Sequence, residues 1–165
     1  AQPGEYLTDY MTRKMVDYLK TPRSRPFFAI CSFYAVHTPL EAKQEMINRY
    51  EMKIEKMGLE EDPMKKEEAG DCKTQQDHSV YAAMIESVDE GIGKMVEALK
   101  ATGQYDHTII VLISDHGGLS NRGNKRELAT TNAPLKAGKG HLYEGGLRVP
   151  MLIHLPGQKK NNLTE

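Results

Sequence analysis

The strongest constraint on the fold is the run from Thr108 to Ile113, which is apolar and β-branched almost throughout. A run without polar alternation is typical of a central strand in a parallel sheet, where both faces are buried. Before it, apolar residues at helical spacing predict a helix from Gln76 to Thr102, which Gly103 is placed to end. A helix that leads into a buried strand is a unit of α/β folds.

Further segments along the chain fit this architecture. An amphipathic pattern predicts a helix from Leu7 to Lys20, with Thr8 as its N-cap. Apolar runs of strand length extend from Phe27 to Tyr34 and from Val149 to Leu155, and a second helical stretch runs from Pro39 to about Lys56. We therefore expect an α/β fold, with a sheet of mainly parallel strands flanked by helices.

Composition excludes several classes of protein. The chain has 165 residues, of which 39% are hydrophobic and 27% are charged, as in soluble globular domains. Its net charge of -1 gives no electrostatic reason to expect nucleic acid or an anionic membrane as a partner. No apolar run is long enough to span a bilayer, and the first residues do not form a signal peptide. Charged residues dominate around 58–75, where we expect a solvated, mobile insertion.

The first candidates for chemistry lie where the best strand ends. Asp115 and His116 follow it directly, and two glycines come next. Open α/β sheets bind their ligands at the carboxyl ends of the strands, and a carboxylate beside an imidazole suits a divalent metal. The alternative is that Asp115 caps the next turn while His116 is a solvated loop residue. The dipeptide alone does not decide between them, because short motifs often occur by chance.

Two more candidates lie in loops. Lys139 stands between two glycines in a long Gly- and Asn-rich stretch, where its ammonium is able to reach an anion; the pattern is not that of a nucleotide-binding P-loop. His37 follows the run that ends at Tyr34, and so would lie at the same edge of the sheet. Glu144 and Arg148 flank a pair of glycines, which disfavours a helix, so we expect a structural ion pair.

In this order, the motifs resemble those of the sulfatase family, a member of the alkaline-phosphatase-like superfamily. The resemblance implies that Asp115 and His116 complete a divalent metal site. Calcium is the metal expected, and manganese or zinc is the alternative because His116 stands where many members carry asparagine. It also implies that Lys139 binds a sulfate oxygen, and that His37 does the same or protonates the leaving alcohol. The resemblance runs from about Tyr10 to Gly157 and covers His37-Thr38-Pro39, Tyr81 to Asp89, Ser114 to Gly118, Gly138-Lys139-Gly140 and Tyr143 to Gly146.

The chain departs from the family in two further respects. It lacks the Cys/Ser-x-Pro-x-Arg motif from which sulfatases make their formylglycine nucleophile, and it lacks the paired aspartates that supply the other metal ligands. Both lie upstream of such a segment in the family. We therefore expect residues 1–165 to be one partial sulfatase domain, an internal fragment without turnover of its own, with the formylglycine in the missing N-terminal part.

The resemblance implies that the parent enzyme hydrolyses a sulfated carbohydrate or an aryl sulfate. Two alternatives stay open: a phosphatase, phosphodiesterase or phosphonate hydrolase of the same superfamily, and a non-catalytic module that binds sulfated glycans. By family habit we expect a periplasmic or secreted protein. The sequence predicts neither the individual substrate nor the oligomeric state.

Overall fold

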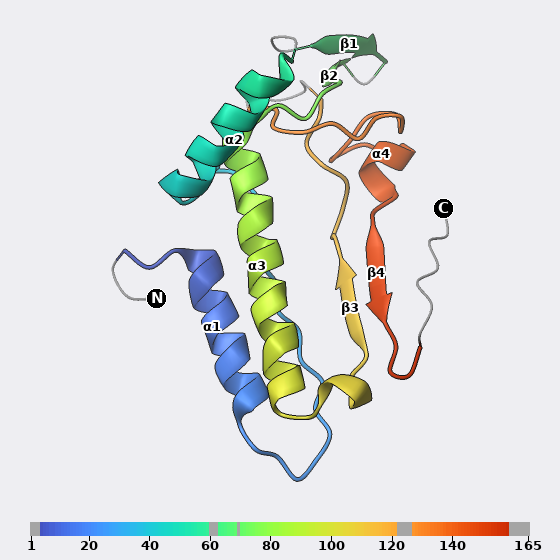
Figure 1. Ribbon diagram of the computed structural model, residues 1–165. Coiled ribbons are helices and arrows are strands. Elements are labelled where there is room, and N and C mark those ends of the chain that lie inside the picture. Colours follow the sequence, from blue (N-terminus) through green and yellow to red (C-terminus); the bar gives the residue numbers. More distant parts are fainter. Residues whose placement is uncertain (1–3, 60–62, 69, 122–126, 159–165) are drawn as a thin grey trace. The chain divides into compact units, whose positions relative to one another are not determined.

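Figure 1 shows the chain in a computed structural model, which describes residues 4–59, 63–68, 70–121 and 127–158. The chain divides into two compact units, which are described separately below. The first unit comprises Ala1–Tyr34, Val88–Leu112 and Met151–Glu165, and the second comprises Ala35–Ser87 and Ile113–Pro150.

Three long helices form in the segments where helices were expected, but the second begins at Gln44 and not at Pro39. They are α1 (Leu7–Lys20), α2 (Gln44–Met57) and α3 (Ser79–Ala101). Gly58 ends α2 in the left-handed conformation, with a φ of 57° that glycine adopts at little cost. The expected N-cap of α1 is wrong: Tyr6 occupies the cap position, while Thr8 lies in the first turn and its carbonyl accepts a 2.8 Å hydrogen bond from the Thr12 hydroxyl.

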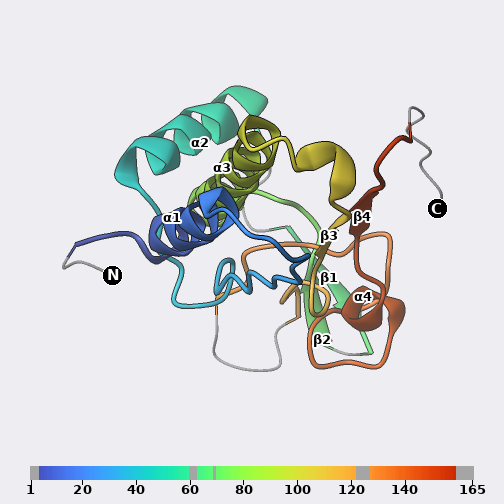
Figure 2. The ribbon, with the colours of Figure 1, turned by 90° about the horizontal axis from the view of Figure 1, so that it is seen from below.

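The core of the first unit lies between α1 and the second half of α3 (Figure 2). Leu19 of α1 packs on Ala98 and Leu99 of α3, and all three are buried. The strands β3 (Ile110–Ile113) and β4 (Met151–His154) form a two-stranded sheet and run in opposite directions in Figure 1. Helices and strands together confirm the α/β class, but the mainly parallel sheet is not confirmed by the described residues.

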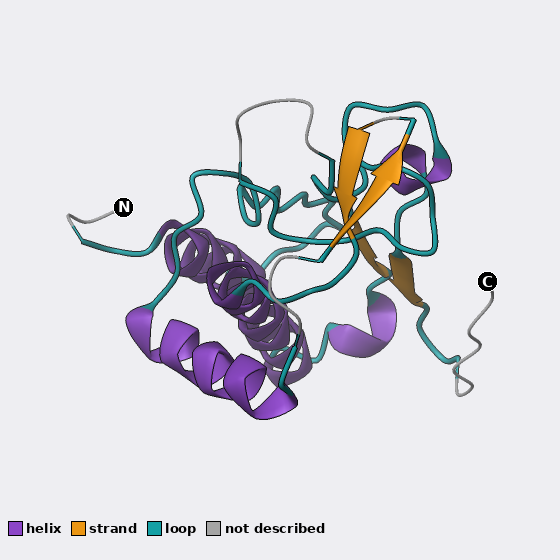
Figure 3. Ribbon diagram, turned by 90° about the horizontal axis from the view of Figure 1, so that it is seen from above, coloured by secondary structure: helices purple, strands orange, loops and turns teal. Residues whose placement is uncertain are grey.

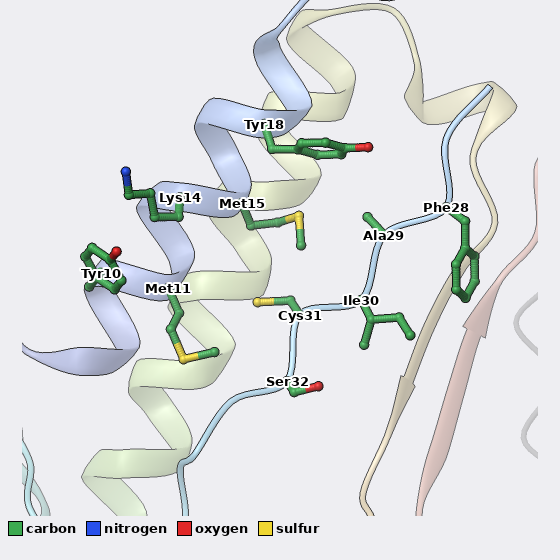
Figure 4. A pocket seen from close by; sticks show the side chains of 10 residues that line it. All are labelled: Tyr10, Met11, Lys14, Met15, Tyr18, Phe28, Ala29, Ile30, Cys31 and Ser32. Carbon is green, nitrogen blue, oxygen red and sulfur yellow. The ribbon is translucent and has the colours of Figure 1, made fainter. Parts of the chain in front are cut away.

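The run from Phe27 to Tyr34 was expected to be a buried strand, and this expectation is wrong. The segment is extended, but no strand of the described chain pairs with it. Its side chains alternate: Cys31 points towards α1, whereas Phe28 and Ile30 point away and are 87% and 72% exposed (Figure 4). Cys31 and its neighbours line an open pocket of about 450 Å³ against α1, which contains none of the candidate site residues.

The strand predicted from Thr108 to Ile113 exists as β3, but it is not the buried central strand that its sequence predicts. Val111 is 53% exposed and Ile113 is 57% exposed. On β4, Leu152 is 60% exposed. These strands therefore present apolar surface that no described residue covers. Among the described residues, no helix is long and apolar enough to cross a membrane.

In the second unit, α2 packs on the first half of α3. The Ser87 hydroxyl of α3 bonds to the Met46 sulfur at 3.2 Å, and Arg49 pairs with Glu86 at 2.8 Å. The segment around 58–75 contains an antiparallel hairpin of β1 (Met64–Glu67) and β2 (Gly70–Lys73), which appears in orange next to the short helix α4 (Glu144–Leu147) in Figure 3. The mobility expected for this segment stays a prediction.

Candidate active site

Asp115 and His116 lie in the turn that follows β3, and local hydrogen bonds hold this turn. The Ser114 hydroxyl donates to the carbonyl of His116 at 2.8 Å. His116 Nδ1 lies 2.9 Å from the carbonyl oxygen of Gly117, which only accepts, so Nδ1 carries the proton. A histidine that donates its second nitrogen to a carbonyl has a fixed ring orientation, as is usual for histidine ligands of metals.

The two side chains face each other. His116 Nε2 lies 3.1 Å from Asp115 Oδ2, and the carboxylate is 83% exposed. With the proton on Nδ1, the Nε2 lone pair and the carboxylate oxygen are both acceptors, so a proton or a cation must lie between them. Two neighbouring ligands at about 2.0–2.6 Å from one metal ion are roughly 2.8–3.7 Å apart when they are at right angles. The oxygen and nitrogen donors and their separation therefore fit a divalent metal.

Among the described residues, no third histidine, cysteine, aspartate or glutamate joins this pair. Asp115 and His116 thus form half of a metal site at most within the described part of the chain, because divalent metals require four or more ligands.

Backbone hydrogen bonds bring the segment of Lys139 to the same place. The amide of Lys139 donates to the carbonyl of Gly118 at 3.0 Å, and the amide of Gly117 donates to the carbonyl of Gly146 at 3.0 Å. Residues that lie more than twenty positions apart in the sequence are thereby fixed side by side. The half-buried Lys139 side chain makes no hydrogen bond or ion pair with any described residue.

Glycines make this close approach possible. A Cβ on Gly117 would lie 1.7 Å from the carbonyl oxygen of Gly145, and one on Gly138 would lie 2.4 Å from the carbonyl oxygen of Gly118. On Gly146 it would lie 2.2 Å from the carbonyl oxygen of His141. All of these contacts are far below the closest that a Cβ tolerates, so only glycine fits these positions.

The short helix α4 (Glu144–Leu147) corrects one expectation. Glu144 and Arg148 pair at 3.7 Å at the two ends of a single helical turn that includes both glycines. Helix propensity alone disfavours this turn, but Gly145 and Gly146 are buried against backbone carbonyls where a side chain would not fit. Close packing therefore overrides propensity at this position.

His37 shares no hydrogen bond or ion pair with the other candidates among the described residues. Its ring is exposed, and Nδ1 donates to the carbonyl of Thr38 at 2.6 Å. No hydrogen bond or ion pair of the described residues joins it to Asp115, His116 or Lys139. The structure thus brings three of the four predicted residues together through one turn and its backbone contacts.

The hairpin of β1 and β2 holds the loop that precedes Lys139, which the sequence did not indicate. Glu68 Oε2 accepts hydrogen bonds from Lys136 Nζ and from the Tyr143 hydroxyl, both at 2.9 Å. These donors lower the pKa of Glu68. Glu67 Oε2 accepts a bond of 3.0 Å from the amide of Ala137. The contacts span about 70 positions, so no local pattern could have revealed them.

A second set of polar side chains also supports this loop. Asn132 bonds to Gly118 and to Ser120, and Asn121 of the same set donates to the Cys72 sulfur at 2.8 Å. Burial raises the pKa of the Cys72 thiol to about 11, so the thiol is protonated at neutral pH and is not a nucleophile. The set is structural, and sequence reasoning missed it because these residue types are common in loops.

Known proteins match this chain along nearly its whole length. The profile of the sulfatase family matches residues 1–165. A sulfatase of Formosa agariphila is 32% identical over an alignment of 163 positions, which covers 93% of this chain and 25% of that protein. Mouse arylsulfatase J is 30% identical over 154 residues, which are 93% of this chain and 21% of that protein. The chain thus spans about a quarter of the length of these relatives.

Solved structures agree with the sequence relatives. The crystal structure of Ps i-CgsB in complex with k-i-k-neocarrahexaose superimposes with a TM-score of 0.71 and 38% identity, over 93% of this chain and 29% of the other. The crystal structure of the putative sulfatase yidJ from Bacteroides fragilis superimposes with a TM-score of 0.65 and 29% identity, over 93% of this chain and 32% of the other. On these grounds the chain belongs to the sulfatase family.

Proposed function

We propose that the full-length protein that contains this chain hydrolyses sulfate esters, and that residues 1–165 form one partial domain of its catalytic part. The observation that supports this most is the hydrogen bond from the Lys139 amide to the Gly118 carbonyl, which joins the segment of Lys139 to the turn that carries Asp115 and His116. Sulfate hydrolysis develops negative charge on the sulfuryl oxygens and on the leaving oxygen. A cationic side chain on a segment that is bonded to an acidic metal half-site is suited to bind such a group.

Each residue has a distinct proposed role. Asp115 and His116 would hold a divalent metal, with calcium expected and manganese or zinc as alternatives, and a bound metal supplies positive charge that polarises the sulfuryl group. Lys139 binds a sulfate oxygen as a point charge. His37 binds the same group or protonates the leaving alcohol, once substrate and the remainder of the enzyme are in place. The formylglycine nucleophile, expected by family resemblance, lies outside this chain.

The substrate proposed is a sulfated carbohydrate, with an aryl sulfate as the simple substitute in assays. The solved relative that holds k-i-k-neocarrahexaose supports the carbohydrate class. Family resemblance also supports a periplasmic or secreted location and a mainly parallel sheet in the complete domain, in which the uncovered strands β3 and β4 would find neighbours.

The test uses the full-length protein with an aryl sulfate, a sulfated oligosaccharide and an aryl phosphate. We expect turnover of the sulfates above the phosphate, and a loss of at least about 100-fold in kcat for Lys139→Ala, because a charged group that acts on the transition state is removed. Lys94→Ala, an exposed lysine on α3, is the matched control and should leave turnover unchanged. Faster hydrolysis of the phosphate would contradict the proposal, and binding of sulfated glycan without turnover would indicate a non-catalytic module.

The metal half-site is tested independently by elemental analysis. Asp115→Ala and His116→Ala should reduce the content of divalent metal, whereas Asp106→Ala, an exposed aspartate, should retain it. Equal metal content in all three variants would contradict the assignment. The isolated chain should show no turnover, since two ligands and no nucleophile are insufficient.

A further inference from the structure

The carboxamide of Asn132 binds both the turn of the metal half-site and the segment before Lys139. Its Oδ1 accepts from the amide of Gly118 at 2.9 Å, and its Nδ2 donates to the carbonyl of Gly118 at 2.8 Å. Both polar groups of one backbone residue are therefore satisfied by one side chain, as an adjacent strand would satisfy them. Gly118 lies two residues after His116, so the carboxamide is coupled to that turn.

The same nitrogen also reaches the other segment. Asn132 Nδ2 lies 3.1 Å from the carbonyl of Ala137 and 2.9 Å from the Ser120 hydroxyl. Ala137 lies two residues before Lys139 and has a φ of 63°, an unfavourable conformation for a residue with a side chain. Two further contacts restrain it: its amide donates to Glu67 at 3.0 Å, and its carbonyl accepts from Ser120 at 3.1 Å.

From these contacts we propose that Asn132 is a positioning residue, which fixes the distance between the Asp115-His116 pair and the ammonium of Lys139. The proposal rests on the proposed sulfatase function of the same site. Asn132 itself touches neither the metal ligands' side chains nor the lysine side chain among the contacts of the described residues. It acts through the backbone of Gly118 and Ala137. No other described side chain bonds to both of these residues.

Asn132→Asp is the informative variant, because it keeps the shape and the acceptor for the Gly118 amide. It replaces the NH₂ donor with an oxygen that would face the carbonyl oxygens of Gly118 and Ala137. The hydrogen bonds of Nδ2 to these two carbonyls are therefore lost. Metal and lysine both act on oxygens whose charge grows in the transition state, and a displacement of about 1 Å costs on the order of 100-fold in rate. We expect kcat of the full-length protein to fall by about 10- to 100-fold, with KM changed by less than about 3-fold.

Asn48→Asp is the matched control. Asn48 lies exposed on α2 and accepts a 2.7 Å bond from Gln44, so the variant makes the same change in charge away from the site. It should keep wild-type kcat. Metal content adds a readout that does not depend on turnover: Asn132→Asp should retain the metal that Asp115→Ala loses, because the ligand pair itself is intact.

The outcomes distinguish a failure of the positioning role from a failure of the proposed sulfatase function. A wild-type protein without sulfate hydrolysis would refute the function, whatever Asn132 does. If the wild type is active, wild-type kcat in folded Asn132→Asp overturns the positioning role, and so does a loss that disappears at temperatures where both proteins are fully folded. If Asn132→Asp does not fold, Ser120→Ala decides: we expect a 3- to 10-fold fall in kcat at constant KM, and an unchanged kcat overturns the proposal.

Discussion

Gly117→Ala tests most directly whether the backbone contacts build the site. The added Cβ would lie 1.7 Å from the carbonyl oxygen of Gly145, 2.8 Å from its carbonyl carbon and 3.2 Å from the Cα of Gly146. Ordinary contact begins at 3.4 Å, so the oxygen would have to withdraw by the difference, 1.7 Å. All three atoms belong to the backbone, and no side-chain rotation relieves the overlap.

The magnitude follows from these contacts. Overpacking in a rigid site costs about 1–3 kcal/mol. Withdrawal of this backbone also breaks the 3.0 Å bond from the Gly117 amide to the carbonyl of Gly146, and such a bond contributes about 1 kcal/mol. The free energy of unfolding should therefore fall by about 2–4 kcal/mol. The adjacent bond between Gly118 and Lys139 should loosen with it, so kcat should decrease by on the order of 100-fold.

The assay is urea denaturation of the full-length protein, together with kcat for an aryl sulfate at a temperature where every variant is folded. Gly93→Ala is the control: its Cβ would meet no atom within 4 Å, and it lies within α3. Alanine in place of an unhindered helical glycine should stabilise by about 0.5–1 kcal/mol and leave kcat unchanged. A Gly117→Ala variant with the wild-type urea midpoint and wild-type kcat would refute the reasoning.

Three further predictions concern stability. Gly91→Ala should cost about 1–2 kcal/mol because its Cβ would lie 2.4 Å from the Thr12 hydroxyl oxygen; Thr12→Ala should recover most of this in a double-mutant cycle, and strict additivity would contradict the clash. Burial raises the pKa of the Cys72 thiol from 9.0 to about 11. The contribution of the protonated thiol to the free energy of unfolding is therefore complete below about pH 9 and is lost as the pH rises to 11. Across this window the wild type should lose roughly 2–3 kcal/mol more than Cys72→Ala, and parallel pH profiles would argue against it. Tyr143→Phe removes an exposed bond to Glu68 and should change the free energy of unfolding by less than about 0.5 kcal/mol; a loss above about 1.5 kcal/mol would be inconsistent with a surface contact.

The sequence predicted helices better than strands for a physical reason. A helix forms its hydrogen bonds within one segment, so the apolar spacing of α1 alone predicted its bounds, Leu7–Lys20. A strand requires a neighbour, and the run from Phe27 to Tyr34 has the composition of a strand without a described partner. The apolar composition of β3 indicated a strand that is stabilised by burial, but it did not indicate which residues would cover the strand.

The sequence indicated candidate residues for the site, but it did not indicate the contacts that support them. Asp115, His116 and Lys139 were identified because their residue types and flanking glycines form recognisable motifs. Asn132 and Glu67 carry no such motif, and their importance comes from contacts that join positions 14 and 70 residues apart. Residues that act through the backbone of others are visible only once the chain is folded.

The uncovered strands have a consequence for handling this chain. Val111 and Leu152 expose apolar side chains on a two-stranded sheet, and within the described part of the chain no strand pairs with the segment that carries Phe28. Unpaired apolar strands are templates for pairing with other chains. Expressed by itself, the 165-residue chain should therefore aggregate in a concentration-dependent manner, and a solubilising fusion would delay this without removing its cause. Biochemical work on the metal half-site is accordingly best begun from the full-length protein.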